Sequence, residues 1–400
     1  MHFKMKWLRK CSILGILLFI AAGVFAPYQS SAATQSEEII ITKWEVLWET
    51  SANEWEEIAT GNQPWQAINF EQGLPPIPEG THSAWYRIDL PETPWGQPSL
   101  NINKLHGYDV EVVSSEGRTL YHSIRTYGLD QYRLLIPVPF QEGAQSLYIH
   151  IKTPSDRIGI QSNMVLGDYQ SLFPKHVWGG LTDLLLISFL ISVAIIMLIC
   201  SIFLRRNHFS SMLTLAILIL SFGVLILGYS ESITMILPGY QTALDTAFGI
   251  ALIIIMLTLS LYFEKLVGAG PWGIIRRYRY FLIIYSILFG AYQLSGELVS
   301  NEFISLYIFS LNIYGLFLVI QLVLLLVISI AYSTKKNSDA ISFIIGYAIF
   351  SLPLAGELIW FIIKRGQYDL IYWKWGILGF VLVMILMLGR KMKNTNRMIG

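Results

Sequence analysis

The order of hydropathy along the chain limits its fold more than any other feature. Residues 34–172 are polar, residues 173–390 contain seven apolar segments, and residues 391–400 are again polar and basic. An apolar segment of about 18 residues or more is long enough to cross the hydrocarbon core of a bilayer. This order predicts a folded polar domain attached to one end of a helical membrane bundle.

Composition and charge support a membrane protein with two different halves. Hydrophobic residues make up 54% of the chain and charged residues only 14%, which is unusual for a soluble domain. Residues 34–180 carry 18 acidic and 9 basic side chains, whereas residues 181–400 carry 9 acidic and 15 basic ones. An acidic polar domain argues against nucleic acid as a partner. The two cysteines, Cys11 and Cys200, fall outside residues 34–172, so no disulfide framework is predicted there.

The first 33 residues have the three-part pattern of a secretory signal peptide. Basic residues within the first ten positions precede an apolar run at 13–25, and small residues follow at 30–33. We predict cleavage after Ala32 or Ala33. An uncleaved additional helix is the alternative, and both interpretations export the residues that follow.

Residues 34–172 read as short strands separated by turn residues. Glu116-Gly117 predicts a hairpin turn because glycine adopts a positive φ without steric cost. Residues 75–80 contain three prolines and read as a loop. The pattern predicts an extracytoplasmic antiparallel β-sandwich or jelly roll. The candidate strands cover residues 85–90, 99–105, 108–113, 119–122, 132–140, 146–152 and 158–166.

Six tryptophans lie in this polar region, and they have two possible roles. Aromatic side chains form platforms for sugar rings, but they also fill the core of a small sandwich. Trp55, Trp65 and Trp95 stand in loop-like contexts, so we predict that these three bind a ligand. The histidines lack the spacing of metal ligands, so we expect neither a metal nor another cofactor.

Residues 173–390 are predicted to form a bundle of seven transmembrane helices. With the first span running inward, twelve basic residues fall in inner segments and three in outer ones. The positive-inside rule therefore predicts a multi-pass protein of the bacterial plasma membrane, with the N-terminal domain outside and the C-terminus in the cytoplasm. The spans cover residues 181–203, 212–229, 242–263, 280–297, 304–332, 341–363 and 373–390.

This topology places most acidic residues of the bundle near its outer end. Glu357 lies deeper, one turn after Pro353 in the sixth span. A carboxylate at that depth is costly unless it is paired, protonated or hydrated, which makes it a functional hypothesis by default. The alternative is a structural contact between Glu357 and Lys374 or Arg365. The predicted cluster that couples the bundle to the polar domain consists of Glu231, Asp245, Glu297, Glu357 and Lys374.

Motifs of enzymes and of familiar seven-helix proteins are missing. The last span has no central lysine for a retinal Schiff base, because Lys374 stands at its entrance. The chain has no HExxH motif, nucleophile elbow or phosphate loop, so we expect no enzyme activity. The spans show no inverted repeat with paired broken helices, which disfavours a secondary transporter.

Several stretches resemble a known extracellular module. They are Ala84–Leu90, Tyr108–Val113 leading into Glu116-Gly117, Ser146–Lys152, and Gly167-Asp168-Tyr169. Followed by seven spans, the chain over about residues 35–390 resembles the bacterial seven-transmembrane receptors with diverse intracellular signalling modules. The resemblance implies a jelly-roll domain that binds carbohydrates or related small ligands. Members usually continue into an output module such as a histidine kinase, whereas residues 391–400 are expected to be a short basic anchor.

The leading functional hypothesis is therefore a transmembrane sensor. Its β-domain would bind a small extracellular ligand, and its helices, surrounded by membrane lipid, would signal to a separate cytoplasmic protein. One alternative is an accessory scaffold for envelope assembly or transport, and another is a channel or transporter that uses Glu357 for coupling. The inner-loop residues predicted to face the cytoplasmic partner are Arg276, Arg277, Arg279, Lys335 and Lys336.

Overall fold

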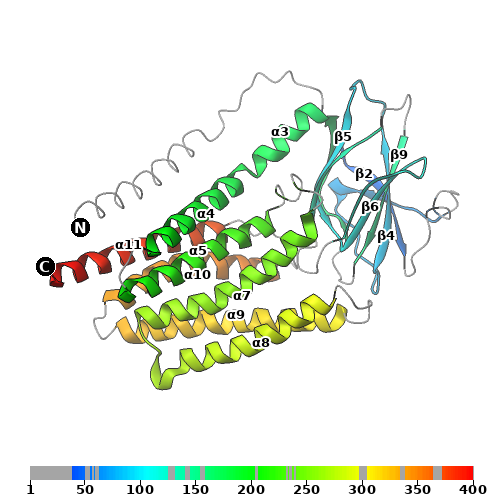
Figure 1. The fold of residues 1–400 in the computed structure, drawn as a ribbon. Coiled ribbons are helices and arrows are strands. Elements are labelled where there is room, and N and C mark those ends of the chain that lie inside the picture. The colour runs from blue at the N-terminus through cyan, green and yellow to red at the C-terminus, as the bar shows by residue number, and fades with distance from the viewer. Residues whose placement is uncertain are drawn as a thin grey trace. The chain divides into compact units, whose positions relative to one another are not determined.

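The computed structural model divides into a β-sheet unit and a helical unit (Figure 1). The first contains the sheets up to Thr182 together with Tyr229–Asp245, and the second contains Asp183–Gly228 and the residues from Thr246 onward. The structure describes residues 38–49, 55, 58, 63–124, 131–139, 145–153, 158–202, 206–230, 233, 237, 240–296, 304–333, 338–363 and 372–399. The predicted signal peptide lies outside these residues.

The β-sheet unit contains two sheets in which all strand pairs are antiparallel. In the five-stranded sheet, β5 is central and pairs with β8, β10 and β11, while β1 pairs with β11. The six-stranded sheet has the order β3-β2-β4-β9-β6-β7. The strands are β1 (Ile39–Ile41), β2 (Lys43–Glu49), β3 (Gln66–Asn69), β4 (Ser83–Leu90), β5 (Pro98–His106), β6 (Asp109–Ser114), β7 (Thr119–Ile124), β8 (Gln131–Pro137), β9 (Gln145–Lys152), β10 (Gly159–Ile160) and β11 (Met164–Asp168).

Both sheets contribute to one hydrophobic core, so they pack face to face. Alternate residues of β4, such as Tyr86 and Ile88, are buried against residues of the other sheet, such as Leu100 of β5 and Met164 of β11. The alternation arises because successive side chains of a strand point to opposite faces of its sheet. The second face of β4 is therefore free to carry the polar and aromatic residues described below.

Most of the predicted strands are present within a residue or two of their predicted limits. The predicted hairpin joins β6 to β7, and Gly117 in its turn has a φ of 80°. The candidate strand at 158–166 is two strands, β10 and β11, which pair with different parts of β5. Residues 75–80 form no strand, as predicted. Strands β1, β2 and β3 were not predicted.

Helix α3 (Tyr169–Gly179) follows β11 directly and packs against the five-stranded sheet. The buried Leu172 lies against Gly167 of β11, where a Cβ atom would come within 3.2 Å of the leucine side chain. Lys175 of α3 forms an ion pair with Glu38, beside β1. These contacts make α3 part of the β-sheet unit.

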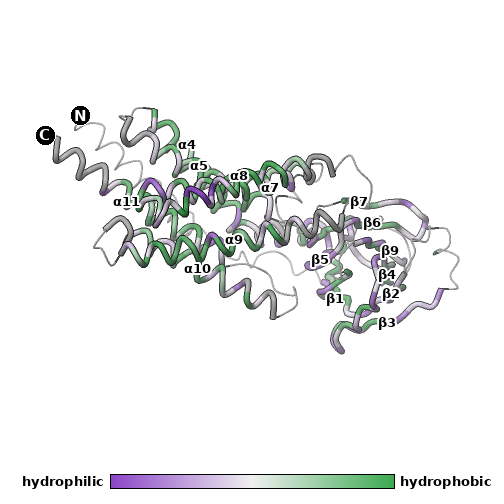
Figure 2. Tube along the Cα trace, turned by 90° about the horizontal axis from the view of Figure 1, so that it is seen from below, coloured by the Kyte–Doolittle hydropathy of each residue, from purple (hydrophilic) through white to green (hydrophobic). Residues whose placement is uncertain are grey.

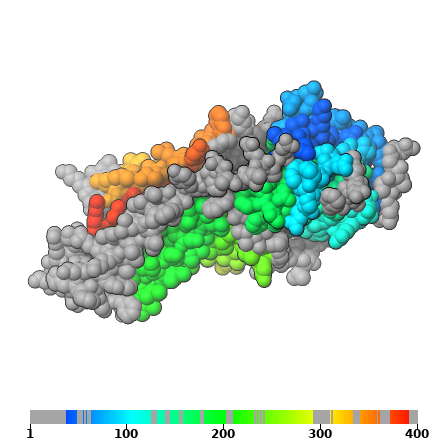
Figure 3. Space-filling view, turned by 90° about the horizontal axis from the view of Figure 1, so that it is seen from above, coloured from blue at the N-terminus to red at the C-terminus, as the bar shows by residue number. Residues whose placement is uncertain are grey.

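A helix occupies each of the seven predicted spans. Five of these helices have described segments that are long and apolar enough to cross a membrane, namely those in α4, α5, α7, α9 and α11. Helices α4, α5 and α7 are mostly hydrophobic along their length in Figure 2, and side chains of α4 lie on the surface in Figure 3. The helices are α4 (Leu181–Ile202), α5 (Arg206–Tyr229), α7 (Gln241–Leu266), α8 (Ile274–Gly296), α9 (Ile304–Ser333), α10 (Ser338–Ile363) and α11 (Trp373–Ile399).

Tyrosine and glutamine side chains connect α9 to its neighbours through backbone carbonyls, and one example is the Tyr278 hydroxyl of α8, which donates to the Phe317 carbonyl of α9. The Tyr285 hydroxyl of α8 donates to the Ser310 carbonyl of α9, and the Tyr347 hydroxyl of α10 donates to the Leu322 carbonyl. The Gln321 side chain of α9 donates to the Met256 carbonyl of α7 at 2.8 Å. Such bonds satisfy polar groups that would otherwise be costly in an apolar interior.

Helices α10 and α11 pack closely because glycines remove side chains from their contact. A Cβ atom at Gly376 would lie 3.1 Å from the Ile349 carbonyl oxygen, and one at Gly379 would lie 2.4 Å from the Ile349 side chain. Small residues at helix crossings let backbones approach closely in membrane proteins. The pair α10–α11 is therefore held in one relative position by its backbone surfaces.

Candidate functional site

The candidate site lies on the face of the six-stranded sheet that points away from the core between the sheets. In β4, Trp85, Arg87 and Asp89 alternate with the core residues Tyr86 and Ile88 and so lie on this second face. Strand pairing places His150 of β9 opposite Trp85, and Glu45 of β2 opposite Arg87. Residues from distant parts of the sequence therefore form one surface.

Four aromatic side chains gather on this face, and we call them the aromatic patch: Trp55, Trp65, Trp85 and Tyr148. The ring centroid of Trp55 lies 4.9 Å from that of Tyr148 and 6.0 Å from that of Trp85. Trp65 lies 6.3 Å from Tyr148. Trp85 is buried under this layer with Leu47 and Ile58, whereas Trp55 and Trp65 are half-buried and lie above it.

Glycine at position 117 allows Trp55 to lie close to the β6–β7 hairpin. A Cβ atom at Gly117 would come within 2.7 Å of the indole nitrogen of Trp55, and the φ of 80° also favours glycine. The hairpin turn predicted from Glu116-Gly117 thus borders the aromatic patch. This relation between a turn and a tryptophan about 60 residues earlier has no local sequence signature.

His150 forms the buried base of this patch. Its ring stacks on Trp85 with centroids 4.2 Å apart and an interplanar angle of 7°, and its Nε2 lies 2.9 Å from the Ser83 hydroxyl. Burial, and then the positive charge of Lys152, lower the pKa of His150 to about 4. His150 is therefore neutral at physiological pH and positions Trp85 rather than adding charge to the face.

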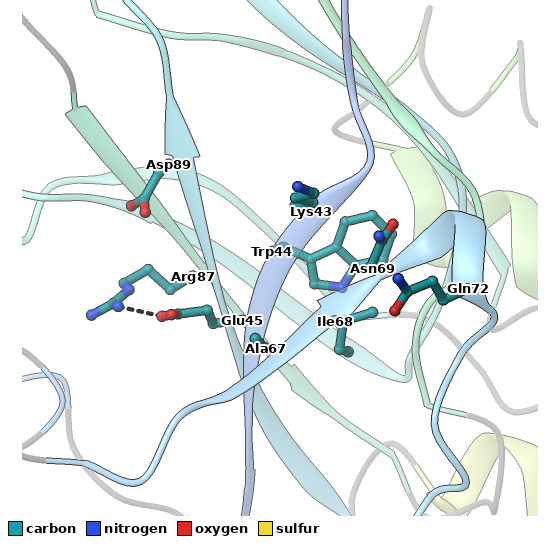
Figure 4. A pocket seen from close by; sticks show the side chains of 9 residues that line it. All are labelled: Lys43, Trp44, Glu45, Ala67, Ile68, Asn69, Gln72, Arg87 and Asp89. Carbon is teal, nitrogen blue, oxygen red and sulfur yellow. Dashed lines mark ion pairs between the residues drawn. The ribbon is translucent and has the colours of Figure 1, made fainter.

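Beside the aromatic patch is a cavity of about 450 Å³, which we call the sheet hollow (Figure 4). Glu45 and Arg87 form an ion pair in it, and the Arg87 guanidinium lies 5.2 Å above the ring of Trp65. Arg87 thus belongs to both features and joins them into one surface. The hollow is lined by Lys43, Trp44, Glu45, Ala67, Ile68, Asn69, Gln72, Arg87 and Asp89.

The chemistry of this surface suits a small molecule with many hydroxyl groups. Lys43 and Arg87 supply donors, Glu45 and Asp89 supply acceptors, and the amide of Asn69 supplies both. The two positive and two negative side chains balance, so the hollow does not select for a strongly charged ligand. Aromatic rings with a few convergent polar groups are the usual composition of a small-molecule site.

The structure brings together two of the three tryptophans predicted to bind a ligand. Trp55 and Trp65 lie in the aromatic patch, whereas Trp95 packs half-buried against the core between the sheets. The main contributors that sequence reasoning missed are Arg87 and Tyr148. Both belong to predicted strands, but only the register of β2, β4 and β9 shows that they share a face with Trp65.

Glu357 of α10 lies apart from this surface and binds the backbone at the beginning of α11. Its Oε1 accepts a hydrogen bond from the Tyr372 backbone N–H and its Oε2 accepts one from the Trp373 N–H, each at 2.7 Å. The residue is 4% exposed. The carboxylate therefore caps the beginning of α11, where unpaired N–H groups and the helix dipole favour a negative charge.

The other members of the predicted coupling cluster have different positions. Lys374 donates to Asp183 of α4 at 2.6 Å, which joins the beginnings of α11 and α4. Asp245 is buried early in α7 and belongs to the β-sheet unit. Glu231 and Glu297 lie outside the described residues. Pro353, Gly356, Glu357, Trp360 and Tyr372 line a second, open cavity of about 570 Å³.

Two of the arginines predicted to face a cytoplasmic partner are paired within the chain. The carboxylate of Glu264, at the end of α7, forms ion pairs with both guanidinium groups. Its Oε1 lies 2.5 Å from a nitrogen of Arg276, and its Oε2 lies 2.6 Å from a nitrogen of Arg279. Arg277 is exposed. Lys335 and Lys336 lie outside the described residues. Within the described part of the chain, no group of three or more His, Cys, Asp or Glu side chains is placed to hold a metal ion.

Comparison with known proteins identifies no family for this chain. No family model and no curated protein matches it. Among solved structures, an FMN-binding beta-glucuronidase from Facaelibacterium prausnitzii L2-6 is similar over 34% of this chain and 23% of that enzyme, with 10% sequence identity and a TM-score of 0.23. A likeness this weak carries no argument about fold or activity.

Proposed function

We propose that this protein is a sensor of the bacterial plasma membrane whose β-sheet unit binds a small polyhydroxylated ligand, with carbohydrate as the leading class. The observation that carries this proposal is the continuity of the aromatic patch with the sheet hollow through Arg87. The patch offers flat apolar rings to the faces of a sugar, and the hollow offers hydrogen-bond partners to its hydroxyl groups.

The proposal places the β-sheet unit, as a jelly-roll domain, outside the cell and seven spans in the membrane. The five membrane-length helices support a multi-pass protein. The Lys374–Asp183 ion pair supports the same direction for α4 and α11, because both residues lie at the beginning of their helix. Equal directions of the first and last helix are what an alternating path through seven spans requires.

Transmission requires that the ligand bind two states of the protein with different affinity. We propose that ligand binding changes the packing of the helices. The Glu357 cap and the glycine contacts keep α10 and α11 together as one element. A separate cytoplasmic signalling protein is the proposed recipient of the change.

A binding screen tests this function. The full-length protein in lipid nanodiscs would be heated with a panel of envelope-derived mono- and oligosaccharides and with non-sugar osmolytes. A ligand that binds only the folded state raises the free energy of unfolding, by about 2.7 kcal/mol at a ligand concentration of 100 times its dissociation constant. The unfolding temperature rises as a consequence. We expect at least one saccharide to raise it. A panel without any stabilising member, at millimolar concentration, would count against a carbohydrate sensor.

A further inference from the structure

The connection between α7 and α8 presents a tryptophan to the outside. Trp272 is 92% exposed, and its backbone has a φ of 51° and a ψ of 17°, in the left-handed region. Gly270 and Gly273 beside it also have positive φ values. A bulky residue in this conformation is strained, and Trp272 recovers little of that strain by burial in the described structure.

The exposed face of α8 begins beside this tryptophan. Its large exposed residues recur at the spacing of one helical face, and Arg277 lies on the same face, one turn before the first of them. The apolar stripe therefore has a cation at the end that is next to Trp272. The stripe consists of Tyr280, Phe281, Ile284, Ile287 and Leu288.

Arg277 differs from its two basic neighbours in its partners. Arg276 and Arg279 bind Glu264, the acidic residue at the end of α7. Arg277 forms no ion pair within the described part of the chain and is exposed. Glu264 thus engages the two neighbouring guanidinium groups, and the guanidinium at the end of the apolar stripe stays available to an external anion.

We propose that Trp272 and Arg277 form a binding site for the headgroup of an anionic phospholipid. The membrane-length part of α7 ends at Leu266, six residues before Trp272, and the apolar stripe of α8 starts soon after it. Tryptophan is enriched at the level of the headgroups, because its ring is apolar and its N–H is polar. Arginine binds phosphate through two parallel hydrogen bonds, and its stem lies along apolar surface.

This lipid site does not depend on which ligand the β-sheet unit binds, or on whether the protein is a sensor. The positive-inside assignment places the α7–α8 connection at the cytoplasmic leaflet, where anionic lipids create a negative surface potential. A soluble protein partner is the competing occupant. It differs in one observable way, since Trp272 would then face water in a pure lipid bilayer.

The position of Trp272 can be measured in the full-length protein. Fluorescence would be recorded in phosphatidylglycerol vesicles for the wild type and for Trp272→Phe, and the difference spectrum assigned to Trp272. We expect this signal to be quenched by lipids brominated close to the headgroup and protected from aqueous iodide. Quenching by iodide with no effect of brominated lipid would overturn the proposal in favour of an aqueous or protein-facing residue.

The contribution of Arg277 has a separate readout that does not require Trp272. Retention of phosphatidylglycerol by the detergent-purified protein would be measured by native mass spectrometry for Arg277→Gln and for the control Arg118→Gln, an exposed arginine in the β6–β7 turn. A basic residue near an anionic lipid surface contributes about 1 kcal/mol, so we expect about fivefold weaker retention for Arg277→Gln alone. Equal retention by both variants, or equal retention of phosphatidylcholine and phosphatidylglycerol by the wild type, would overturn the proposal.

Discussion

Replacing Glu357 with glutamine removes the charge of a buried helix cap without changing its size. In the structure each carboxylate oxygen accepts one backbone N–H, from Tyr372 and from Trp373, at 2.7 Å. An amide has only one acceptor oxygen, and its NH₂ group would face one of these donors. The substitution therefore loses at least one charge-assisted hydrogen bond, worth about 1.5–3 kcal/mol, and about 0.3–1 kcal/mol of favourable interaction with the helix dipole.

A local loss of about 2 kcal/mol corresponds to about 30-fold faster hydrogen exchange wherever exchange proceeds by local opening. We expect this acceleration in peptides that contain Tyr372 and Trp373, measured by mass spectrometry on the full-length protein in nanodiscs. Lys374→Gln is the matched control, because it breaks the ion pair with Asp183 at the same helix end and leaves both Glu357 bonds intact. Unchanged exchange at Tyr372 and Trp373 in a folded Glu357→Gln protein would refute the capping role.

Two further predictions concern the packing of each unit. The pKa of His150 is lowered to about 4 by burial and Lys152, so the unfolded chain, with a pKa near 6.5, binds the proton first. The contribution of His150 to the free energy of unfolding should therefore be fully present above about pH 6.5 and should decrease toward pH 4 by up to about 1.4 kcal/mol per pH unit. His150→Gln should flatten this pH dependence in denaturation experiments. Gly376→Ala places a Cβ atom 3.1 Å from the Ile349 carbonyl and should destabilise the α10–α11 contact by about 1–3 kcal/mol. Thermal unfolding of both variants tests this, with Gly389→Ala as the control, because Gly389 lies in the same helix and a Cβ atom there would have no neighbouring atom within 4 Å. Gly389→Ala should be neutral or stabilising, and equal destabilisation by both substitutions would contradict the packing argument.

Hydropathy and periodicity in the sequence located helices and most strands, and five of the helices have described segments long and apolar enough to cross a membrane. The end of β4, from Arg87 to Leu90, alternates between polar residues and core residues, and in β9 every second residue from Leu147 to Ile151 lies in the core between the sheets. Strand β2 was missed because Val46, Leu47 and Trp48 are consecutive apolar residues, and Leu47 packs under the aromatic patch on the second face. A strand with apolar residues on both faces loses the period of two on which such predictions depend.

The candidate site was only partly predictable because its contacts depend on strand register. Trp55 and Trp65 could be selected from their loop-like contexts, but only strand pairing places Arg87 opposite Glu45 of β2 and Tyr148 of β9, on the face where it contacts Trp65. The role of Glu357 was open for a similar reason, since its described partners are backbone N–H groups that have no side-chain signature. Charge counting also treated Arg276 and Arg279 as available, whereas Glu264 binds both.

The central claim is that the ligand binds on the face of the six-stranded sheet that points away from the core between the sheets. Isothermal titration calorimetry tests this claim most directly. A saccharide found in the screen would be titrated into full-length wild type, Trp65→Ala and Trp95→Ala, with unfolding midpoints confirming that each variant is folded. Trp65 lies beside Arg87 in the aromatic patch, whereas Trp95 packs against the core elsewhere. We predict at least about tenfold weaker binding for Trp65→Ala and a change within about twofold for Trp95→Ala. Wild-type affinity in Trp65→Ala, or loss of binding only in Trp95→Ala, would contradict the assignment.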